Sequence, residues 1–383
     1  MKSKIRILLT AGGTGGHIYP LISVTDEIYH LAGEQNRDLE IRYFGPASPL
    51  NGEFENRGIK VEKIISSKLR RYFSLNNFID AFGFIFGFFQ ALCKIFWFMP
   101  DAVFSKGGPG ALAVVLAARF YRIPVMIHES DTSPGLTNSL SAKFAKKIFI
   151  AFEKTARYFP PEKTKLVGNP VRANILRDVP DQETTKKNLG FNPAEPLILV
   201  IGGSQGALKI NNFISDNFGE ILDLAQIIHQ SGPANFLETK KETDFLLQGL
   251  GGSYQKRYQL VGYFNQGKDL KEAFAAADLV ISRAGSGGIF EIAAFGKPSI
   301  LIPIPEEVVG EHQIVNAYEY AKSGTAIVIE ESNFKSSIVL DQARKILTDP
   351  ELRKKMSQAA KNFAKPEAGK IIAEEILKLV LNQ

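Results

Sequence analysis

The sequence predicts an α/β fold of two Rossmann-like, doubly wound domains, and two observations carry that prediction. A short apolar run ends twice in a glycine-rich loop that opens a helix, at residues 5–17 and again at 197–207. The loops lie 190 positions apart, counted from Gly13 to Gly203, so they mark matching points in two similar domains. A chain of 383 residues is long enough for two domains that each bury a core.

The first half of the chain alternates between the patterns of strands and helices. We expect strands at 5–10, 40–44, 61–65, 102–104, 124–127 and 147–150, with helices between them such as 17–33, 110–121 and 136–145. This alternation predicts a parallel sheet that binds ligands at the carboxyl ends of its strands.

The second half repeats the scheme. Strands are expected near 197–201, 226–229, 258–261, 279–282, 299–302 and 326–329, while 160–196 is interpreted as a linker followed by the first helix of the second domain. Residues 367–381 are amphipathic and should form a helix that packs back onto the first domain. The expected domains are therefore 1–165 with 367–383, and 166–366.

Composition and charge narrow the class of protein. The single cysteine, Cys93, excludes an internal disulfide, and the apolar run after Arg6 is too short for a signal peptide, so a cytoplasmic location is expected. Residues 1–165 hold 22 Lys and Arg against 14 Asp and Glu, a net +8, whereas the rest carries −2. The basic half should face an anionic partner; its basic residues are too scattered for a nucleic-acid site, which favours a membrane surface.

The aromatic segment 78–99 supports the membrane interpretation. It is preceded by Lys68, Arg70 and Arg71, and Asp80, Gln90 and Lys94 interrupt its apolar pattern, which argues against a transmembrane span. We expect a helix that packs on the domain and offers an aromatic face to the cytoplasmic side of an anionic bilayer. A wholly buried helix is the alternative.

The glycine loops themselves are candidate anion sites. Glycine lets the backbone approach a ligand, and the following helix offers unpaired N–H groups at the positive end of its dipole. Neither loop has the lysine of a P-loop, and Ile18 stands where the dinucleotide pattern needs glycine. The alternative is that these glycines only form tight turns.

The segment 282–298 predicts a nucleotide-sugar site. It combines a strand end, a glycine loop, a helix start and an acidic residue one and a half turns into that helix, Glu291, which can accept both ribose hydroxyls. Further on, His312, Gln313 and Asn316 lie at another helix start, where amide groups suit sugar hydroxyls.

With these motifs assembled, the chain resembles the MurG family of UDP-N-acetylglucosamine transferases, glycosyltransferase family 28. The matching stretches follow the family's order over the whole chain: 12–17, 105–108, 128–129, 135–138, 168–172, 202–207, 275–278, 282–298 and 310–317. The resemblance implies a GT-B fold, an inverting transfer from UDP-N-acetylglucosamine to the C4 hydroxyl of lipid I to form lipid II, no cofactor and no metal. The absence of any Asp-x-Asp pair and of paired histidine spacing agrees with a metal-free site.

Specific roles follow from the motifs and the resemblance. His17 is the expected general base, because imidazole titrates near neutral pH, and Glu129 is the second candidate. His17 could instead bind the acceptor diphosphate or cap its helix. The expected donor-binding residues are Thr14, Gly15, Gly16, Asp131, Arg172, Ser204, Phe264, Ser286, Gly287, Gly288, Ile289, Phe290, Glu291, His312 and Gln313. The expected acceptor-binding residues are Gly12, Gly13, Thr14, Gly15, Gly16 and Asn138.

Two departures from the family pattern leave the sugar less certain than the reaction. Ser130 and Asp131 follow His-Glu where Gln-Asn is common, and the loop at 283–288 reads Arg-Ala-Gly-Ser-Gly-Gly rather than the Ala-Leu-Thr version. The alternatives are a UDP-sugar transferase acting on another lipid, a UDP-N-acetylglucosamine epimerase and a non-catalytic sugar-binding subunit.

Overall fold

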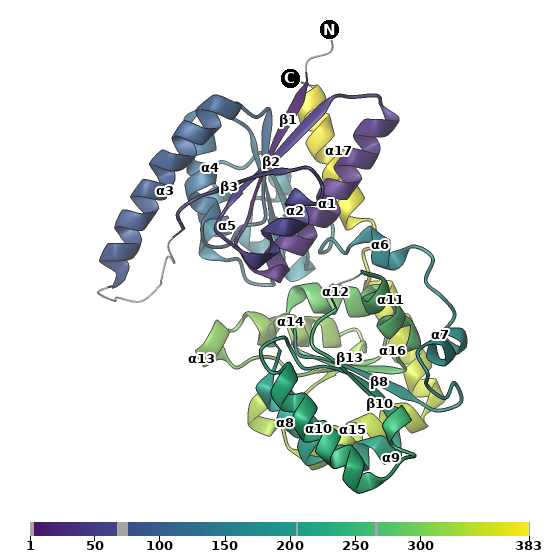
Figure 1. Ribbon diagram of the computed structural model, residues 1–383. Helices are drawn as coiled ribbons and strands as arrows, with labels where there is room; N and C mark the ends of the chain where they lie inside the picture. The colour runs from purple at the N-terminus through teal and green to yellow at the C-terminus, as the bar shows by residue number, and fades with distance from the viewer. Residues whose placement is uncertain (1–3, 67–75, 204–205, 265–266, 383) are drawn as a thin grey trace. The chain divides into compact units, whose positions relative to one another are not determined.

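The computed structural model describes residues 4–66, 76–203, 206–264 and 267–382. These residues form two compact units, one of 1–172 with 365–383 and the other of 173–364 (Figure 1). Ser204, Lys68, Arg70 and Arg71, which carried expectations above, lie outside the described residues.

The first unit is a parallel sheet in the strand order β3-β2-β1-β4-β5-β6-β7. Its strands are β1 (Ile5–Thr10), β2 (Leu39–Gly45), β3 (Lys60–Lys63), β4 (Ala102–Ser105), β5 (Val125–Glu129), β6 (Lys147–Ile150) and β7 (Thr164–Leu166). Its helices are α1 (Gly15–Glu34), α2 (Gly52–Glu55), α3 (Asn76–Phe98), α4 (Ala111–Phe120), α5 (Leu136–Ser141) and α17 (Ala368–Leu381).

Successive side chains along these strands point to opposite faces of the sheet and pack into two separate hydrophobic cores. Leu9 and Phe104 face a core shared with α1 and α17, which lie side by side (Figure 1), whereas Leu8 and Val103 face one shared with α3 and α4. The C-terminal segment thus belongs to the first unit, where Glu375 of α17 pairs with Lys165 at 2.8 Å.

The second unit repeats the topology in the order β10-β9-β8-β11-β12-β13. Its strands are β8 (Leu197–Ile201), β9 (Gln226–Gln230), β10 (Tyr258–Val261), β11 (Leu279–Ser282), β12 (Ser299–Leu301) and β13 (Ala326–Val328). Its helices are α6 (Ala173–Leu176), α7 (Gln182–Asn188), α8 (Leu208–Asp216), α9 (Phe218–Leu224), α10 (Phe236–Leu250), α11 (Gly267–Ala276), α12 (Ser286–Ala294), α13 (Glu306–Val309), α14 (His312–Ala321), α15 (Ser336–Thr348) and α16 (Pro350–Phe363).

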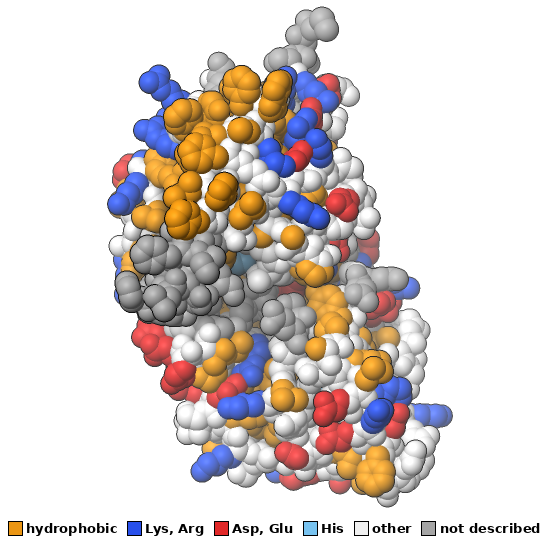
Figure 2. All heavy atoms as spheres, turned by 60° about the vertical axis from the view of Figure 1, so that its left-hand side comes forward, with side chains coloured by type: hydrophobic (Ala, Val, Ile, Leu, Met, Phe, Trp, Pro, Cys, Tyr) orange, Lys and Arg blue, Asp and Glu red, His pale blue; other side chains and the backbone are white. Residues whose placement is uncertain are grey.

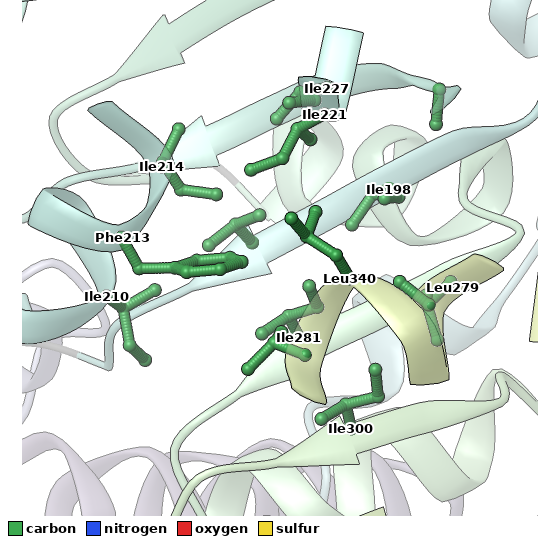
Figure 3. Close-up of a cluster of buried hydrophobic side chains, with 14 of the residues drawn as sticks. Ile198, Ile210, Phe213, Ile214, Ile221, Ile227, Leu279, Ile281, Ile300 and Leu340 are labelled. Carbon is green, nitrogen blue, oxygen red and sulfur yellow. The ribbon is translucent and has the colours of Figure 1, made fainter. Parts of the chain in front are cut away.

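Branched aliphatic side chains fill the core of the second unit. Ile198, Leu279, Ile281 and Ile300 project from neighbouring strands toward Leu340 of α15, as Figure 3 shows. Two sheets of parallel strands, each wrapped by helices, form two doubly wound, Rossmann-like units, so the predicted α/β class is confirmed.

Local expectations differ from the structure in a few places. The helix expected at 136–145 ends at Ser141, and α1 begins two residues before the expected start. The stretch interpreted as a linker contains the edge strand β7, and the contact boundary between units follows Arg172 rather than residue 165.

Candidate functional site

The loops after β1 and β4 meet at the carboxyl edge of the first sheet, where the strand order reverses direction. The N–H of Gly12 donates to the carbonyl of Gly107 at 2.8 Å. Gly108 has φ +85°, and a Cβ there would lie 3.0 Å from both the nitrogen and the Cα of Gly12. Glycine is thus needed at 108 both for its left-handed backbone and for this contact. Such a switch point is the usual ligand site of a doubly wound sheet.

His17 lies on this contact between the two loops. Its Nδ1 is 2.8 Å from Thr14 Oγ1, and its Nε2 lies 2.9 Å from where a Cβ on Gly108 would stand. Burial, and then the charge of Lys106, lower the pKa of His17 to about 4, although Asp131 opposes the shift. The ring is therefore neutral at pH 7 and able to accept a proton.

The start of α1 presents backbone donors beside His17. The helix begins at Gly15, so the N–H groups of Gly15 and Gly16 have no partner within the helix. No atom lies within 4 Å of a Cβ built on Gly16, which leaves room for a ligand. Gly13, the remaining glycine of the loop, is held through its carbonyl by Ser48 Oγ at 2.7 Å.

Glu129, at the end of β5, shapes the loop that follows it. Its Oε1 accepts from the Asp131 N–H at 3.0 Å, and its Oε2 accepts from the Gly135 N–H at 3.0 Å and from Asn138 Nδ2 at 2.9 Å. Burial, and then the charge of Asp131, raise its pKa. Both carboxylate oxygens accept hydrogen bonds, so Glu129 stabilises the loop that follows β5.

Several buried polar atoms near this edge have no hydrogen-bond partner among the described residues. They are Thr10 Oγ1, Lys106 Nζ, His128 Nδ1, Asn138 Oδ1 and both amide atoms of Asn169. His128 donates through Nε2 to the Gly168 carbonyl at 2.8 Å, so its Nδ1 is an acceptor. Buried groups of this kind usually meet a ligand or water. Sequence reasoning gave no role to Lys106 or Asn169, although both stand in the matched motifs.

Arg172 belongs to the first unit, where it lies over an aromatic ring of α1. Its guanidinium carbon is 4.4 Å from the ring centre of Tyr19. The adjacent Val171 carbonyl accepts from Ser23 Oγ at 2.8 Å. Arg172 therefore stands beside the helix that carries His17, within the unit expected to hold the acceptor.

The second glycine loop follows β8. Gly203 and Gly206 both have left-handed backbones, and a Cβ on Gly206 would lie 2.2 Å from the Ser231 carbonyl. Gln230 at the end of β9 donates to the Gly203 carbonyl at 2.8 Å. The neighbouring strand thus holds the loop in place.

The start of α12 is the second set of backbone donors. Ser286, Gly287 and Gly288 form its first turn; the N–H groups of Gly287 and Gly288 have no partner within the helix, whereas Ile289 donates to the Gly285 carbonyl at 3.1 Å. The side chains of Ile289 and Phe290 are buried in the unit. Glu291, by contrast, is partly exposed on the same helix.

Arg283 is the residue of the second unit that corresponds to Lys106. Lys106 follows Ser105, the last residue of β4, and Arg283 follows Ser282, the last residue of β11. β4 and β11 correspond because each pairs with the first strand of its unit, β1 or β8. Arg283 Nη2 is 2.6 Å from the buried carboxylate of Glu331, and its Nη1 donates to the Ile302 carbonyl at 3.2 Å. Its charge is neutralised within the unit.

The remaining expected donor residues vary in exposure. Gln313 Oε1 accepts from the Ile304 N–H at 3.1 Å and so holds the proline-rich loop before α13. His312 is partly exposed, but its Nδ1 is buried without a partner among the described residues. Phe264 is only 6% exposed. Within the described residues, no group of three or more His, Cys, Asp and Glu side chains is arranged to hold a metal.

Comparisons with known proteins agree with this arrangement. Residues 7–150 match the glycosyltransferase family 28 N-terminal domain, and residues 197–372 match the glycosyltransferase family 28 C-terminal domain. The chain is 36% identical over 340 residues to the UDP-N-acetylglucosamine–N-acetylmuramyl-(pentapeptide) pyrophosphoryl-undecaprenol N-acetylglucosamine transferase of Clostridium tetani, covering 88% of this chain and 89% of that one.

Two further comparisons extend over nearly the whole chain. A Bacillus cereus protein of the same name, numbered 2, is 36% identical over 372 residues, which are 97% of this chain and 99% of that one. The crystal structure of Acinetobacter baumannii MurG superposes with a TM-score of 0.73 at 26% identity, covering 98% of this chain and 99% of that one.

Proposed function

The chain belongs to glycosyltransferase family 28, and on this premise we propose that it transfers N-acetylglucosamine from UDP-N-acetylglucosamine to N-acetylmuramyl-(pentapeptide) pyrophosphoryl-undecaprenol. The acceptor is lipid I and the product is lipid II, a precursor of peptidoglycan. The sugar is transferred to the C4 hydroxyl with inversion at the anomeric carbon.

One observation carries this proposal: each unit has its own anion site at the same topological position. At the starts of α1 and α12, the N–H groups of Gly15 and Gly16 and those of Gly287 and Gly288 have no partner within their helices, at the carboxyl edge of a parallel sheet in each unit. The reaction joins two substrates that each carry a diphosphate, so it needs two such sites. An epimerase acting on one nucleotide-sugar needs only one.

The second unit is assigned to the donor. The N–H groups of Ser286, Gly287 and Gly288 meet the diphosphate of UDP, and Glu291 accepts the ribose hydroxyls. Charge on the leaving UDP is then stabilised by the fixed backbone dipoles at the start of α12.

In the first unit, His17 is the general base. It takes the proton of the attacking C4 hydroxyl, and the contact with Thr14 orients its ring. Glu129 is the weaker candidate, because both of its oxygens already accept hydrogen bonds from the loop that it holds.

A transfer assay tests the function. Purified protein with UDP-N-acetylglucosamine and a short-chain lipid I should release UDP and form a β-1,4-linked disaccharide, and EDTA should leave the rate unchanged. Glu291→Ala should raise the KM for the donor. Release of UDP only with diacylglycerol would identify another lipid transferase, and formation of the 2-epimer without acceptor would identify an epimerase; either result would overturn the proposal.

We also propose that the first unit binds the cytoplasmic face of an anionic membrane through α3. Phe82, Phe86, Phe89 and Trp97 are between 59% and 83% exposed, and Figure 2 shows hydrophobic side chains gathered on this face. The inner side of α3 is anchored in the unit by buried residues such as Ile95. Among the helices of the described residues, none is both long and apolar enough to span a bilayer.

Basic residues border this aromatic face. Arg119 and Arg122, at the end of α4 beside the exposed Phe120, are exposed and have no ion pair within the described part of the chain. α4 packs along α3, and Tyr121 contacts Phe96 with ring centres 6.4 Å apart. Aromatic rings flanked by arginines suit insertion among anionic headgroups.

Vesicle sedimentation tests the membrane proposal. The protein should bind vesicles containing phosphatidylglycerol, and replacing Phe86 and Phe89 by Ser should weaken binding about tenfold for each ring, since each inserted ring contributes roughly 1.5 kcal/mol. Phe245→Ser on α10, where the ring is 74% exposed, is the matched control and should bind as the wild type does. Equal binding of all three proteins would refute the proposal. Phe88 is unsuitable for this test, because it packs against the core.

A further inference from the structure

Lys106 is a buried cation to which no role has yet been assigned. It follows β4, is only 2% exposed, and its Nζ has no hydrogen-bond partner in the described part of the chain. A buried ammonium without a partner is costly, because it loses its hydration and receives no compensating contact. Such a group is retained where a ligand supplies the missing contact.

The two halves of the chain provide an internal comparison. Arg283, at the corresponding position of the second unit, forms an ion pair with Glu331, with Nη2 2.6 Å from the carboxylate. Lys106 has no such ion pair among the described residues. The ammonium of Lys106 is thus balanced only through space, by Glu129 and Asp131, whereas the guanidinium of Arg283 is in direct contact with its carboxylate.

Strand register places Lys106 in the middle of the site. Thr10 pairs with Ser105, and Ser105 pairs with Ile127, so Lys106 comes next in a row between Ala11 and His128. Its own N–H donates to the Thr10 carbonyl at 3.0 Å.

Four titratable groups surround Lys106. His17 and His128 feel its charge, while Glu129 and Asp131 act on its ammonium. Glu129 is occupied by its own loop, as described above.

We propose that Lys106 binds the diphosphate of the lipid-linked acceptor, together with the N–H groups of Gly15 and Gly16, and thereby positions the acceptor hydroxyl at His17. This inference rests on the proposed function and adds Lys106 to it, as the positively charged residue of the acceptor site. The glycine loop supplies dipoles, and Lys106 supplies the full charge that a diphosphate needs.

Binding of the acceptor should also change the pKa of His17. Burial lowers the pKa of Lys106 to about 8, which leaves it mostly protonated at pH 7. Its charge helps to keep His17 neutral in the free enzyme. A bound diphosphate offsets that charge, so the proton affinity of His17 rises when the acceptor is present. The imidazole then becomes a stronger base at the moment it is needed.

Lys106→Met tests the proposal, since it keeps an unbranched side chain only one atom shorter and removes the charge. The KM for the acceptor should rise at least tenfold while the KM for UDP-N-acetylglucosamine stays within twofold. Tm should rise or stay unchanged, because an unpaired buried charge has been removed. In a histidine NMR titration, the apparent pKa of His17 should move upward in the variant.

Lys297→Met is the matched control. Lys297 is a partly buried lysine, and it donates to the carbonyls of Ala275 and Ala277 at 3.1 and 2.8 Å. Its replacement should lower Tm and leave the KM for the acceptor unchanged. A Lys106→Met protein with lower Tm and unchanged acceptor KM would show a merely structural lysine and overturn the proposal. A rise confined to the donor KM would assign the charge to UDP and would also overturn it.

A binding measurement separates this inference from the proposed function. With saturating UDP present to occupy the donor site, inorganic pyrophosphate should raise the Tm of the wild type but not that of Lys106→Met. If the wild type fails to use lipid I, the proposed function fails, and this shift still decides whether Lys106 binds a diphosphate. Equal shifts in both proteins would refute its role.

Discussion

Replacing Gly108 by alanine tests the contact that holds the first site together. Gly108 has φ +85°, where an L-residue costs about 1–2 kcal/mol. The added Cβ would also stand 2.9 Å from His17 Nε2 and 3.0 Å from the Gly12 backbone. Overpacking of this kind costs about 1–3 kcal/mol, and a backbone neighbour cannot rotate away. The expected loss of unfolding free energy is therefore about 2–5 kcal/mol.

Gly58→Ala separates the two costs. Gly58 lies in the same unit with φ +72°, and no atom stands within 4 Å of a Cβ built on it. This control should lose only the conformational part, about 1–2 kcal/mol. It should also keep full transferase activity, since it lies outside the site.

Urea unfolding followed by circular dichroism measures the stability, and steady-state transfer measures the activity. Gly108→Ala should lose about a hundredfold or more in kcat, because the methyl group displaces His17 from its position and a displacement of about 1 Å has a cost of that size. If Gly108→Ala and Gly58→Ala behaved alike in both assays, the close packing of His17 on the β4 loop would be refuted.

Three further predictions concern buried charges. Burial lowers the pKa of His229 to about 3, so between pH 6.5 and 3 only the unfolded chain takes up a proton at this residue. Acidification over this range should therefore lower the free energy of unfolding by up to about 1.4 kcal/mol per pH unit. His229→Gln should reduce this pH dependence in urea unfolding, and an unchanged dependence would contradict the assignment. Arg283→Met should lower the free energy of unfolding by about 1.5–3 kcal/mol, because Glu331 loses its contact with the guanidinium and keeps only Lys209 at 2.6 Å; a variant as stable as the wild type in urea unfolding would exclude a supporting ion pair. Glu129→Gln should lower Tm as well as activity, because an amide cannot accept all the hydrogen bonds of the loop; lost activity at unchanged Tm would restore Glu129 as a candidate base.

Much of the fold could be predicted because its signals are local. The runs at 5–10, 197–201 and 279–282 are apolar, are bounded by glycine or polar residues, and form β1, β8 and β11 with the expected limits. β7 was missed because it is three residues long and largely exposed, so only its pairing with β6 makes it a strand. Helix α5 stops at Ser141, earlier than its pattern suggests.

The candidate site was predicted in outline only. The glycine loops and His17 are recognisable from a dozen consecutive residues. The environment of Lys106 is not, because it depends on pairing among three strands whose residues lie far apart in the sequence. The same limit applies to Glu129, which reads as a candidate base in the sequence but holds the loop after its strand in the structure.

The sequence by itself determined the alternation of strands and helices, the two glycine loops and membership of the family, since each of these is written in short motifs and their order. Tertiary structure decided which charges are cancelled and which remain. Lys106 and Arg283 each follow a serine at a strand end, yet only Arg283 meets a carboxylate from a distant segment. The energy of a buried charge depends on its neighbours in space, and those neighbours are set by how the sheet and its loops pack.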